Sequence, residues 1–307
     1  MSLQFILGNS GSGKSSFLYQ KVIEESMAHP MENYLILVPE QFTMQTQKEL
    51  VSLHPKHAIM NIDVLSFNRL AFRVFDELGK TDFVVLEETG KNLVLRKVAG
   101  EKKKELPVLG ANLKKMGYIS EVKSLLSEFM QYNVTPEMLE ELTGEGKTSS
   151  FSYKMRDVLT MYRGFLDYVE GTYITAEEIL DLLAELADDS ALLRGSTLVF
   201  DGFTGFTPNQ NKLLTVLFPL VKDVLVTVSM DEREDFYAKP QMQDLLYMSR
   251  KMIRSLMEIA RETGVCVKEP VVLGGGESKR YKNAPALYHL EQNLLRRKQT
   301  AYEKEQD

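Results

Sequence analysis

The amino-acid sequence predicts an α/β protein in which a parallel sheet is interrupted by an all-helical insertion. Over residues 1–80, short apolar runs alternate with amphipathic helical stretches, a pattern typical of strand–helix–strand units. From about residue 84 to 194, apolar residues recur every three or four positions, which indicates helices. Strand-like runs then return. We therefore expect a sheet domain of residues 1–80 and 195–275, a helical insertion of residues 81–194, and a linker with a C-terminal helix in residues 276–307 that leads to absent domains.

The first part of the chain contains three strand candidates and three helix candidates. The strand candidates are continuous apolar runs, as buried strands of parallel sheets are. Pro39 suits the first turn of one helix, and Gly79 suits the end of another. The predicted strands are residues 3–7, 34–38 and 58–67, and the predicted helices are residues 14–27, 39–53 and 68–79.

The insertion consists of amphipathic helical segments almost throughout. Thr175 and Glu178 have the spacing of a capping box, in which each side chain bonds the backbone N–H of the other residue. The methionine and aromatic stripes are interpreted as the core of a helical bundle rather than as a cofactor site, and they include Phe151, Tyr153, Met155, Met161, Tyr162 and Phe165. The predicted helical segments are residues 92–100, 116–132, 135–144, 149–171 and 175–186.

Strands and helices alternate again after the insertion. Apolar runs of strand length are separated by segments with helical periodicity. The predicted strands are residues 196–203 and 223–230, with one or two short strands in residues 264–273, and the predicted helices are residues 208–218, 241–262 and 286–307.

Composition and charge are those of an ordinary globular protein. The chain has 307 residues, of which 44% are hydrophobic, and a formal net charge of −6. Any nucleic-acid surface must therefore be a local patch. The single cysteine, Cys266, excludes an internal disulfide and a multi-cysteine metal site. No apolar run reaches the ~18 residues that suit a membrane span, and no signal-like segment opens the chain. We expect a cytoplasmic protein without a membrane partner.

The most specific motif follows the first predicted strand. Residues 8–15 read GNSGSGKS and fit the pattern G-x-x-x-x-G-K-[ST] of phosphate-binding loops. Glycines let successive backbone N–H groups point at phosphate oxygens, and the following helix adds the positive end of its dipole. Lys14 is suited to reach the β- and γ-phosphates, and Ser15 to ligate Mg²⁺. The predicted nucleotide-binding residues are Gly8, Asn9, Ser10, Gly11, Ser12, Gly13, Lys14 and Ser15.

A phosphate loop of this kind needs a second carboxylate to hold Mg²⁺ from the other side. Asp201 ends an apolar strand-like run and is the candidate, with a plain turn residue as its alternative role. Many nucleotide hydrolases place a glutamate directly after this aspartate to polarise water, but Gly202 follows here. Gln210 is one residue that could orient water instead. The site by itself therefore favours nucleotide binding with weak or no hydrolysis.

Four segments taken together resemble one family of proteins. They are the loop at residues 8–15, LILVPEQFTMQTQKEL (35–50), NIDVLSFNRLAFRVFDELG (61–79) and VFDGFTGFTPNQ (199–210). In these segments the sequence is similar to the B subunit of the bacterial AddAB-type ATP-dependent helicase/deoxyribonuclease, called RexB in some lineages. The resemblance covers nearly the whole chain. Because proteins of that family are several times longer, this chain resembles an N-terminal piece of one.

The resemblance implies a superfamily 1 helicase-like architecture, with a RecA-like P-loop domain that carries the helical insertion. Asp201 becomes the remnant of the second helicase motif, and ATP and Mg²⁺ become the expected ligands. The expected partners are single-stranded DNA and, in a heterodimer, the A subunit of the helicase/nuclease. The implied processes are DNA end resection, Chi recognition and double-strand break repair by homologous recombination. The residues that the resemblance places at DNA are Gln41, Phe42, Thr43, Ser66, Phe67 and Arg69. For Phe42 and Phe67, helix packing is the alternative role.

The sequence departs from motor helicases at two places. Gln4 is a poor match for the glutamine that reads adenine upstream of the loop, and Gly202 replaces the glutamate of the second motif. Both departures suit a protein that descends from a motor and no longer acts as one. The family's nuclease residues and iron–sulfur cysteines lie mostly beyond the end of this chain, and Cys266 matches no cluster spacing. No catalytic residue is therefore assigned.

Two other classes of function remain open at this point. A small-molecule kinase of the phosphate-loop type would use the helical insertion as a lid, but it needs an acceptor-binding carboxylate or an arginine lid that the motifs do not supply. A docking module with a vestigial loop would serve mainly to bind the A subunit. Lys14→Ala discriminates the docking module, because it would leave binding of the A subunit unchanged and ATP binding would already be absent.

Overall fold

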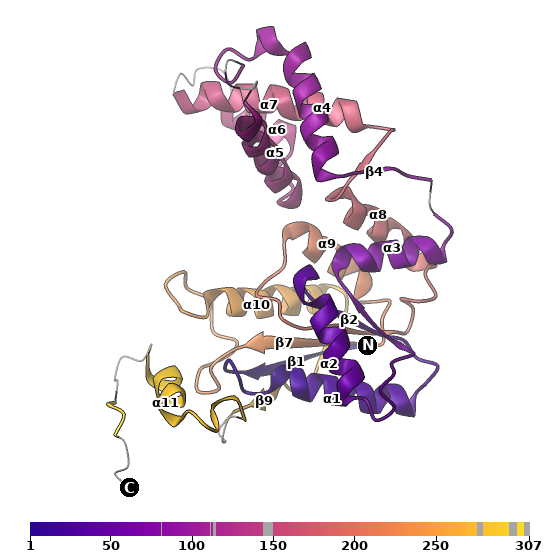
Figure 1. Cartoon of the computed structure of the whole chain (residues 1–307), viewed down its shortest axis with the longest axis vertical. Coiled ribbons are helices and arrows are strands. Elements are labelled where there is room, and N and C mark those ends of the chain that lie inside the picture. Colours follow the sequence, from indigo (N-terminus) through magenta and orange to yellow (C-terminus); the bar gives the residue numbers. More distant parts are fainter. Residues whose placement is uncertain are drawn as a thin grey trace. The chain divides into compact units, whose positions relative to one another are not determined.

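The computed structural model describes residues 1–80, 82–110, 112, 115–143, 150–274, 279–294 and 300–303. The chain forms two compact units, traced in sequence colours in Figure 1. The sheet unit contains Met1–Ser66, Leu192–Gly205 and Phe218–Asp307, and the helical unit contains Phe67–Ala191 and Phe206–Leu217. Each unit is therefore assembled from stretches that are distant in the sequence.

The sheet unit contains a seven-stranded sheet, counted over the described residues, in which every strand pairing is parallel. The strand order is β3-β2-β6-β7-β1-β8, and β9 also pairs with β1. The carboxyl ends of parallel strands meet at one edge, which is where open α/β sheets bind ligands. The strands are β1 (Ser2–Gly8), β2 (Tyr34–Leu37), β3 (Ile62–Leu65), β6 (Thr197–Phe200), β7 (Asp223–Ser229), β8 (Cys266–Val267) and β9 (Val271–Leu273).

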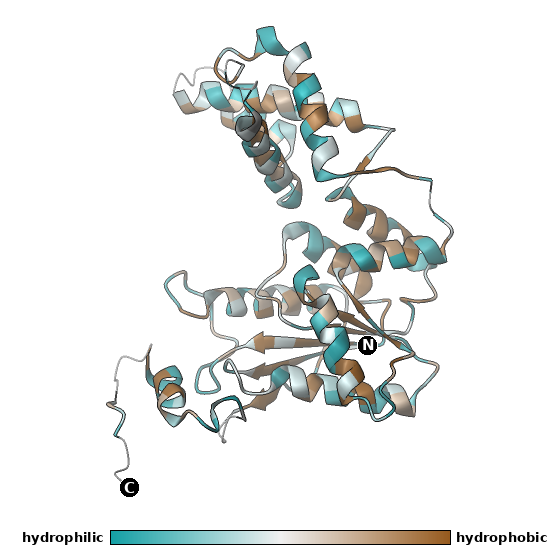
Figure 2. Cartoon of the chain, in the orientation of Figure 1, coloured by the Kyte–Doolittle hydropathy of each residue, from teal (hydrophilic) through white to brown (hydrophobic). Residues whose placement is uncertain are grey.

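Helices cover both faces of this sheet, and the central strands are buried as a result. α1 (Lys14–Ala28) and α10 (Tyr247–Glu262) lie on opposite sides of β1 and β7 in Figure 1, and Figure 2 shows these strands as largely hydrophobic ribbons. On the α1 side, Ile6 of β1 packs with Leu18 and Val22. Burial on both faces explains why these strands are continuous apolar runs in the sequence.

The helical unit contains seven α-helices and one two-stranded parallel ribbon among its described residues. Its core includes Met161, Tyr162 and Phe165, with Met155 packed against them, so these residues form a bundle core as predicted. The prediction was wrong for Phe151 and Tyr153, whose side chains are exposed to solvent. The elements are α3 (Phe67–Glu77), β4 (Val85–Leu86), α4 (Glu88–Glu101), α5 (Met116–Gln131), α6 (Pro136–Thr143), α7 (Ser150–Val169), β5 (Ile174–Thr175), α8 (Glu178–Leu186) and α9 (Pro208–Leu217).

The capping box predicted at the start of α8 is confirmed. The backbone N–H of Thr175 donates to Glu178 Oε2 at 2.7 Å, and the backbone N–H of Glu178 donates to Thr175 Oγ1 at 3.3 Å. The ribbon of β4 and β5 was not predicted, because strands of two residues are too short to show a hydrophobic period.

The third strand is shorter than predicted. It covers Ile62–Leu65 rather than residues 58–67. Its partner β2 offers four residues, from Tyr34 opposite Ile62 to Leu37 opposite Leu65, so the ladder ends with them.

The long helix predicted for residues 241–262 is also shorter, since α10 begins at Tyr247. Asp244 Oδ2 accepts the backbone N–H of Gln241 at 3.1 Å and a hydrogen bond from Arg250 at 2.8 Å. These bonds hold residues 241–246 in turns, as side chain–backbone bonds of aspartate often do.

Two helices that were predicted for the sheet domain, α3 and α9, group with the helical unit. Phe67, at the start of α3, contacts Phe206, close to the start of α9, edge to face with ring centres 6.1 Å apart. Packing among α3, α8 and α9 thus decides their grouping.

The C-terminal helix predicted for residues 286–307 is shorter than predicted, since α11 covers Pro285–Asn293 and the described residues 300–303 are not helical. Residues 295–299 and 304–307 of that prediction lie outside the described residues. The same holds for residues 144 and 149 of the predicted insertion helices. Among the described residues, no helix combines the length and the apolar character that crossing a membrane requires.

Candidate functional site

The glycine-rich loop connects the end of β1 to the start of α1, at the carboxyl edge of the sheet. Gly11 and Gly13 have φ angles of +79° and +90°, which glycine adopts without strain. A Cβ on Gly8 would lie 2.3 Å from the carbonyl oxygen of Leu273. The loop therefore needs glycine at these three positions, and α1 begins directly after it at Lys14.

The loop forms one wall of a cavity of about 610 Å³. The Ser12 hydroxyl is buried and has no hydrogen-bond partner among the described residues, which fits a group that awaits a ligand oxygen. The first N–H groups of an α-helix have no partner within the helix, and those of α1 lie at this loop, where an anion is favoured. The cavity is lined by residues 9–17, Gln20, Glu232, Leu273, Gly274, Arg280, Tyr288, Glu291 and Gln292.

Lys14 is the cation of the loop. Its Nζ donates to the carbonyl oxygens of Gly8 and Asn9, both at 2.9 Å. Burial lowers the pKa of Lys14, while the negative charges of Asp201 and Glu291 act in the opposite direction. Burial disfavours the charged form of a lysine, so the negative charge of a phosphate group bound at the loop would stabilise the Lys14 ammonium group.

Asp201 follows β6 and is brought to the loop by the order of the strands. Its Oδ1 accepts hydrogen bonds from Ser15 Oγ at 3.1 Å and from Thr227 Oγ1 at 2.5 Å. Its Oδ2 accepts a hydrogen bond from the Tyr19 hydroxyl at 2.7 Å. The side chain is buried, and burial together with Asp201 raises the pKa of Tyr19. Ser15 and Asp201, 186 positions apart in the sequence, are thus in direct contact.

The sequence reasoning missed Tyr19 and Thr227, although both left a signal. Tyr19 lies four residues after Ser15 on α1, so both side chains share a helix face. Thr227 is a buried polar residue within the apolar run of β7. In a strand that is buried on both faces, such a residue needs a partner.

The residue that follows Asp201 cannot act on water. Gly202 has a φ of +79° and lies near Pro39, where the chain bends away from the sheet. Gln210, the alternative considered from the sequence, uses its side-chain oxygen to accept the Thr207 backbone N–H at 2.9 Å in a cap at the start of α9. The carboxylates that do line the cavity are Glu232 and Glu291, and neither was predicted.

The residues predicted to contact DNA follow β2 and β3, which are parallel neighbours in register from Tyr34–Leu37 to Ile62–Leu65. Gln41 and Phe42 lie in the short 3₁₀ helix η1 (Glu40–Phe42), and Thr43 begins α2 (Thr43–Leu53). Both segments leave the carboxyl edge of the sheet.

The side chains of these six residues differ in accessibility. Phe42 is exposed, as a base-stacking residue must be, and Arg69 on α3 is exposed too. Phe67 is buried against Phe206, which favours its packing role. Thr43 and Ser66 are buried and Gln41 is exposed. The DNA contacts stay a prediction.

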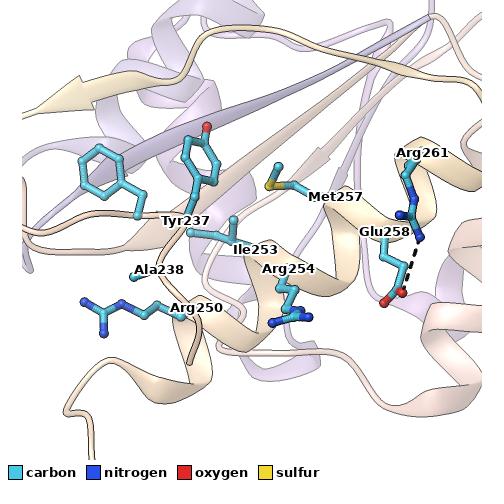
Figure 3. A pocket seen from close by; sticks show the side chains of 9 residues that line it. Tyr237, Ala238, Arg250, Ile253, Arg254, Met257, Glu258 and Arg261 are labelled. Carbon is cyan, nitrogen blue, oxygen red and sulfur yellow. Dashed lines mark ion pairs between the residues drawn. The ribbon is translucent and has the colours of Figure 1, made fainter. Parts of the chain in front are cut away.

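Another cavity, of about 290 Å³, lies between α10 and residues 236–238 (Figure 3). Arg250 on its wall is held by two carboxylates, Glu234 at 2.5 Å and Asp244 at 2.8 Å. Figure 3 also shows the ion pair between Arg261 and Glu258. This arrangement fastens the loop before α10 to the helix, and we interpret the cavity as structural.

The fold and the site define a class of protein, namely an α/β protein with a parallel sheet that gathers a glycine-rich loop, a lysine and a buried aspartate at its carboxyl edge. Residues 5–291 match the family described as ADDB, N-terminal. The chain belongs to this family, and the resemblance identified from the sequence is confirmed.

Relatives of known name agree with this assignment. The chain is 45% identical over its full length to the B subunit of the ATP-dependent helicase/deoxyribonuclease from Lachnoclostridium phytofermentans. It is 31% and 32% identical, over 99% of its length, to the proteins of the same name from Clostridium kluyveri and Caldanaerobacter subterraneus. It covers 26–27% of these relatives, so it spans about a quarter of their length.

Proposed function

We propose that this chain is the N-terminal part of the B subunit of an ATP-dependent helicase/deoxyribonuclease and that it binds ATP with Mg²⁺ in the sheet unit. The observation that carries the proposal is the hydrogen bond of 3.1 Å between Ser15 and Asp201. It joins the helix that starts at the glycine-rich loop to the end of β6. A hydroxyl and a carboxylate oxygen are the ligands that Mg²⁺ takes beside nucleotide phosphates.

The residues present fit this ligand. The Ser12 hydroxyl, which has no partner in the described part of the chain, and the N–H groups at the start of α1 are donors for phosphate oxygens, and Lys14 supplies a positive charge. Ser15 and Asp201 would hold Mg²⁺, which neutralises phosphate charge when bound. The parallel strand order and the position of the loop after β1 support a RecA-like P-loop domain.

Weak or absent hydrolysis is the second part of the proposal. Gly202 follows Asp201, and the side-chain oxygen of Gln210 is used in a helix cap. Both carboxylate oxygens of Asp201 already accept hydrogen bonds from hydroxyl groups. These features favour a nucleotide that serves as a structural or regulatory ligand.

The names of the relatives, which call them the B subunit of an ATP-dependent helicase/deoxyribonuclease, support a wider role on DNA. We propose a cytoplasmic protein that associates with the A subunit of the enzyme and handles single-stranded DNA during double-strand break repair by homologous recombination. The exposed Phe42 and Arg69 are the residues that best support DNA contact, through stacking and phosphate binding.

ATP binding and hydrolysis by this chain, with and without single-stranded DNA, test the proposal. Lys14→Ala is expected to abolish measurable Mg²⁺–ATP binding by calorimetry. Lys21→Ala is the matched control, because Lys21 lies on the same helix, pairs with Glu25 at 2.6 Å and does not line the cavity. Oligonucleotide binding should weaken as salt rises.

Three results are distinguishable. Tight Mg²⁺–ATP binding that is lost only in Lys14→Ala, with negligible ATP turnover, supports a protein that descends from a helicase motor and no longer acts as one. Turnover that DNA stimulates would contradict the claim about hydrolysis and would show that another residue orients water. Absence of binding by the unaltered chain would overturn the nucleotide site and favour the docking module.

A further inference from the structure

The C-terminal segment, residues 279–294, packs against the glycine-rich loop. It consists of the 3₁₀ helix η4 (Lys279–Tyr281) and α11, which is coloured yellow in Figure 1. Arg280 Nη1 donates to Ser10 Oγ at 3.3 Å, and a Cβ on Gly11 would lie 2.7 Å from Arg280 Cδ. The arginine therefore lies directly on the loop, where any side chain on Gly11 would displace it.

This segment forms the opposite wall of the cavity over the loop. It contributes Arg280, Tyr288, Glu291 and Gln292 to the lining. Tyr288 packs on Tyr281 with ring centres 5.8 Å apart, and the Arg280 guanidinium lies 5.9 Å from the Tyr281 ring centre. Arginine and both tyrosines thus form one continuous group beside the loop.

The charges in the cavity are balanced. Lys14 and Arg280 are the cations of the lining, and Glu232 and Glu291 are carboxylates of the same lining. A polyphosphate brought alone would meet both carboxylates. Mg²⁺ cancels part of the negative charge of a polyphosphate, and Lys14 and Arg280 can balance the charge that remains.

The present hydrogen bond of Arg280 is one that a ligand can replace. Its acceptor, the Ser10 hydroxyl, is neutral and 3.3 Å away, whereas charge-assisted bonds from guanidinium to phosphate are shorter, stronger and often bidentate. Ser10 itself belongs to the loop, so a phosphate bound there lies within reach of the same guanidinium.

We propose that Arg280 is a second phosphate-binding cation of the nucleotide site and that bound Mg²⁺–ATP clamps the C-terminal segment onto the glycine-rich loop. This proposal rests on the proposed function, because it names a further ligand-binding residue of the same site. In the ATP-bound chain, the Tyr288 ring would line the cavity beside the nucleotide. Nucleotide binding and the docking of residues 279–294 then become one coupled event.

Calorimetry with Mg²⁺–ATP and Mg²⁺–AMP tests this assignment. Arg280→Ala is expected to weaken ATP binding about tenfold or more, the usual effect of losing a charged hydrogen bond, and AMP binding much less. Arg280→Lys should recover part of the affinity. Lys282→Ala is the matched control, because Lys282 is an exposed cation two residues away that does not line the cavity.

Amide hydrogen exchange in α11 supplies a second readout. Mg²⁺–ATP should slow exchange of residues 285–293 in the unaltered chain and in Lys282→Ala, but not in Arg280→Ala. Equal ATP affinity of Arg280→Ala and the unaltered chain would overturn the Arg280 assignment while leaving the proposed function intact. Equal protection of α11 in Arg280→Ala would overturn the clamp. If the unaltered chain bound no ATP, both proposals would fail together.

Discussion

Two carboxylates, one in each unit, are buried to nearly the same extent but have different partners. Asp201 in the sheet unit is 6% exposed, and Glu177 in the helical unit is 7% exposed. Both oxygens of Glu177 accept hydrogen bonds from Lys91 Nζ, at 3.0 and 2.8 Å, and Lys91 is itself 1% exposed. Lys91 also contacts Glu88, at 3.3 Å.

Asp201 instead accepts hydrogen bonds from the hydroxyls of Ser15, Tyr19 and Thr227. Among the described residues it forms no ion pair. A carboxylate that a buried lysine neutralises is part of the structure, since its charge is already satisfied. A carboxylate whose direct partners are neutral hydroxyls is available to bind a cation that arrives with a ligand. The partners of a buried charge therefore separate a structural role from a binding role.

The largest effect is expected from breaking the pair in the helical unit. Lys91→Ala removes the cation that contacts the buried Glu177 carboxylate. The free energy of unfolding should fall by about 3–5 kcal/mol, because the carboxylate would stay buried without that partner. Urea unfolding followed by circular dichroism measures this. Lys102→Ala is the control, because Lys102 pairs with Glu105 in an exposed contact at 3.3 Å, and such pairs contribute about 0–1 kcal/mol. Similar losses in both variants would contradict the structural role of Lys91.

The second prediction concerns the charge of Asp201. Asp201→Asn keeps the shape of the side chain and removes its negative charge, so Mg²⁺–ATP affinity should fall roughly tenfold or more. The free energy of unfolding should change by only about 1 kcal/mol. With EDTA in place of Mg²⁺, Asp201→Asn should bind ATP as tightly as the unaltered chain does under the same conditions. Unchanged Mg²⁺–ATP affinity would place Asp201 in the same structural class as Glu177.

The smallest effect is expected from Tyr19→Phe, which removes one hydroxyl donor from Asp201. The loss in stability should be about 1–1.5 kcal/mol, while Mg²⁺–ATP affinity stays equal or rises because Oδ2 is released. Burial raises the pKa of Tyr19 in the folded chain. The stability difference between the two chains should therefore be constant below about pH 10, where tyrosine in the unfolded chain keeps its proton, and shrink above it.

Thermal or urea unfolding of both chains from pH 7 to 11 measures this difference. A difference that grew above pH 10 would mean that the ionised form of Tyr19 is favoured by folding, contrary to its contacts. A clear drop in Mg²⁺–ATP affinity would show that the hydroxyl helps to bind the ligand.

Local sequence patterns predicted much of the fold correctly. The run LQFIL and its successors predict β1, β2 and β7 because a strand that is buried on both faces must be apolar throughout. The glycine-rich loop was also predicted correctly, because Gly11 and Gly13 have the positive φ angles that its sequence pattern anticipates. Helix boundaries were less accurate where a side chain competed with the backbone, as at Asp244.

Local sequence patterns were enough to specify the α/β class, the loop before Lys14 and the candidate aspartate, since strand character and turn chemistry depend on neighbouring residues. Which residues meet depends on tertiary packing. Parallel pairing places β6 two strands away from β1, so Asp201 reaches Ser15, and packing of the C-terminal segment brings Arg280 to Ser10. Contacts across 186 and 270 positions of sequence separation leave no local pattern, because chain topology and not the neighbouring residues creates them.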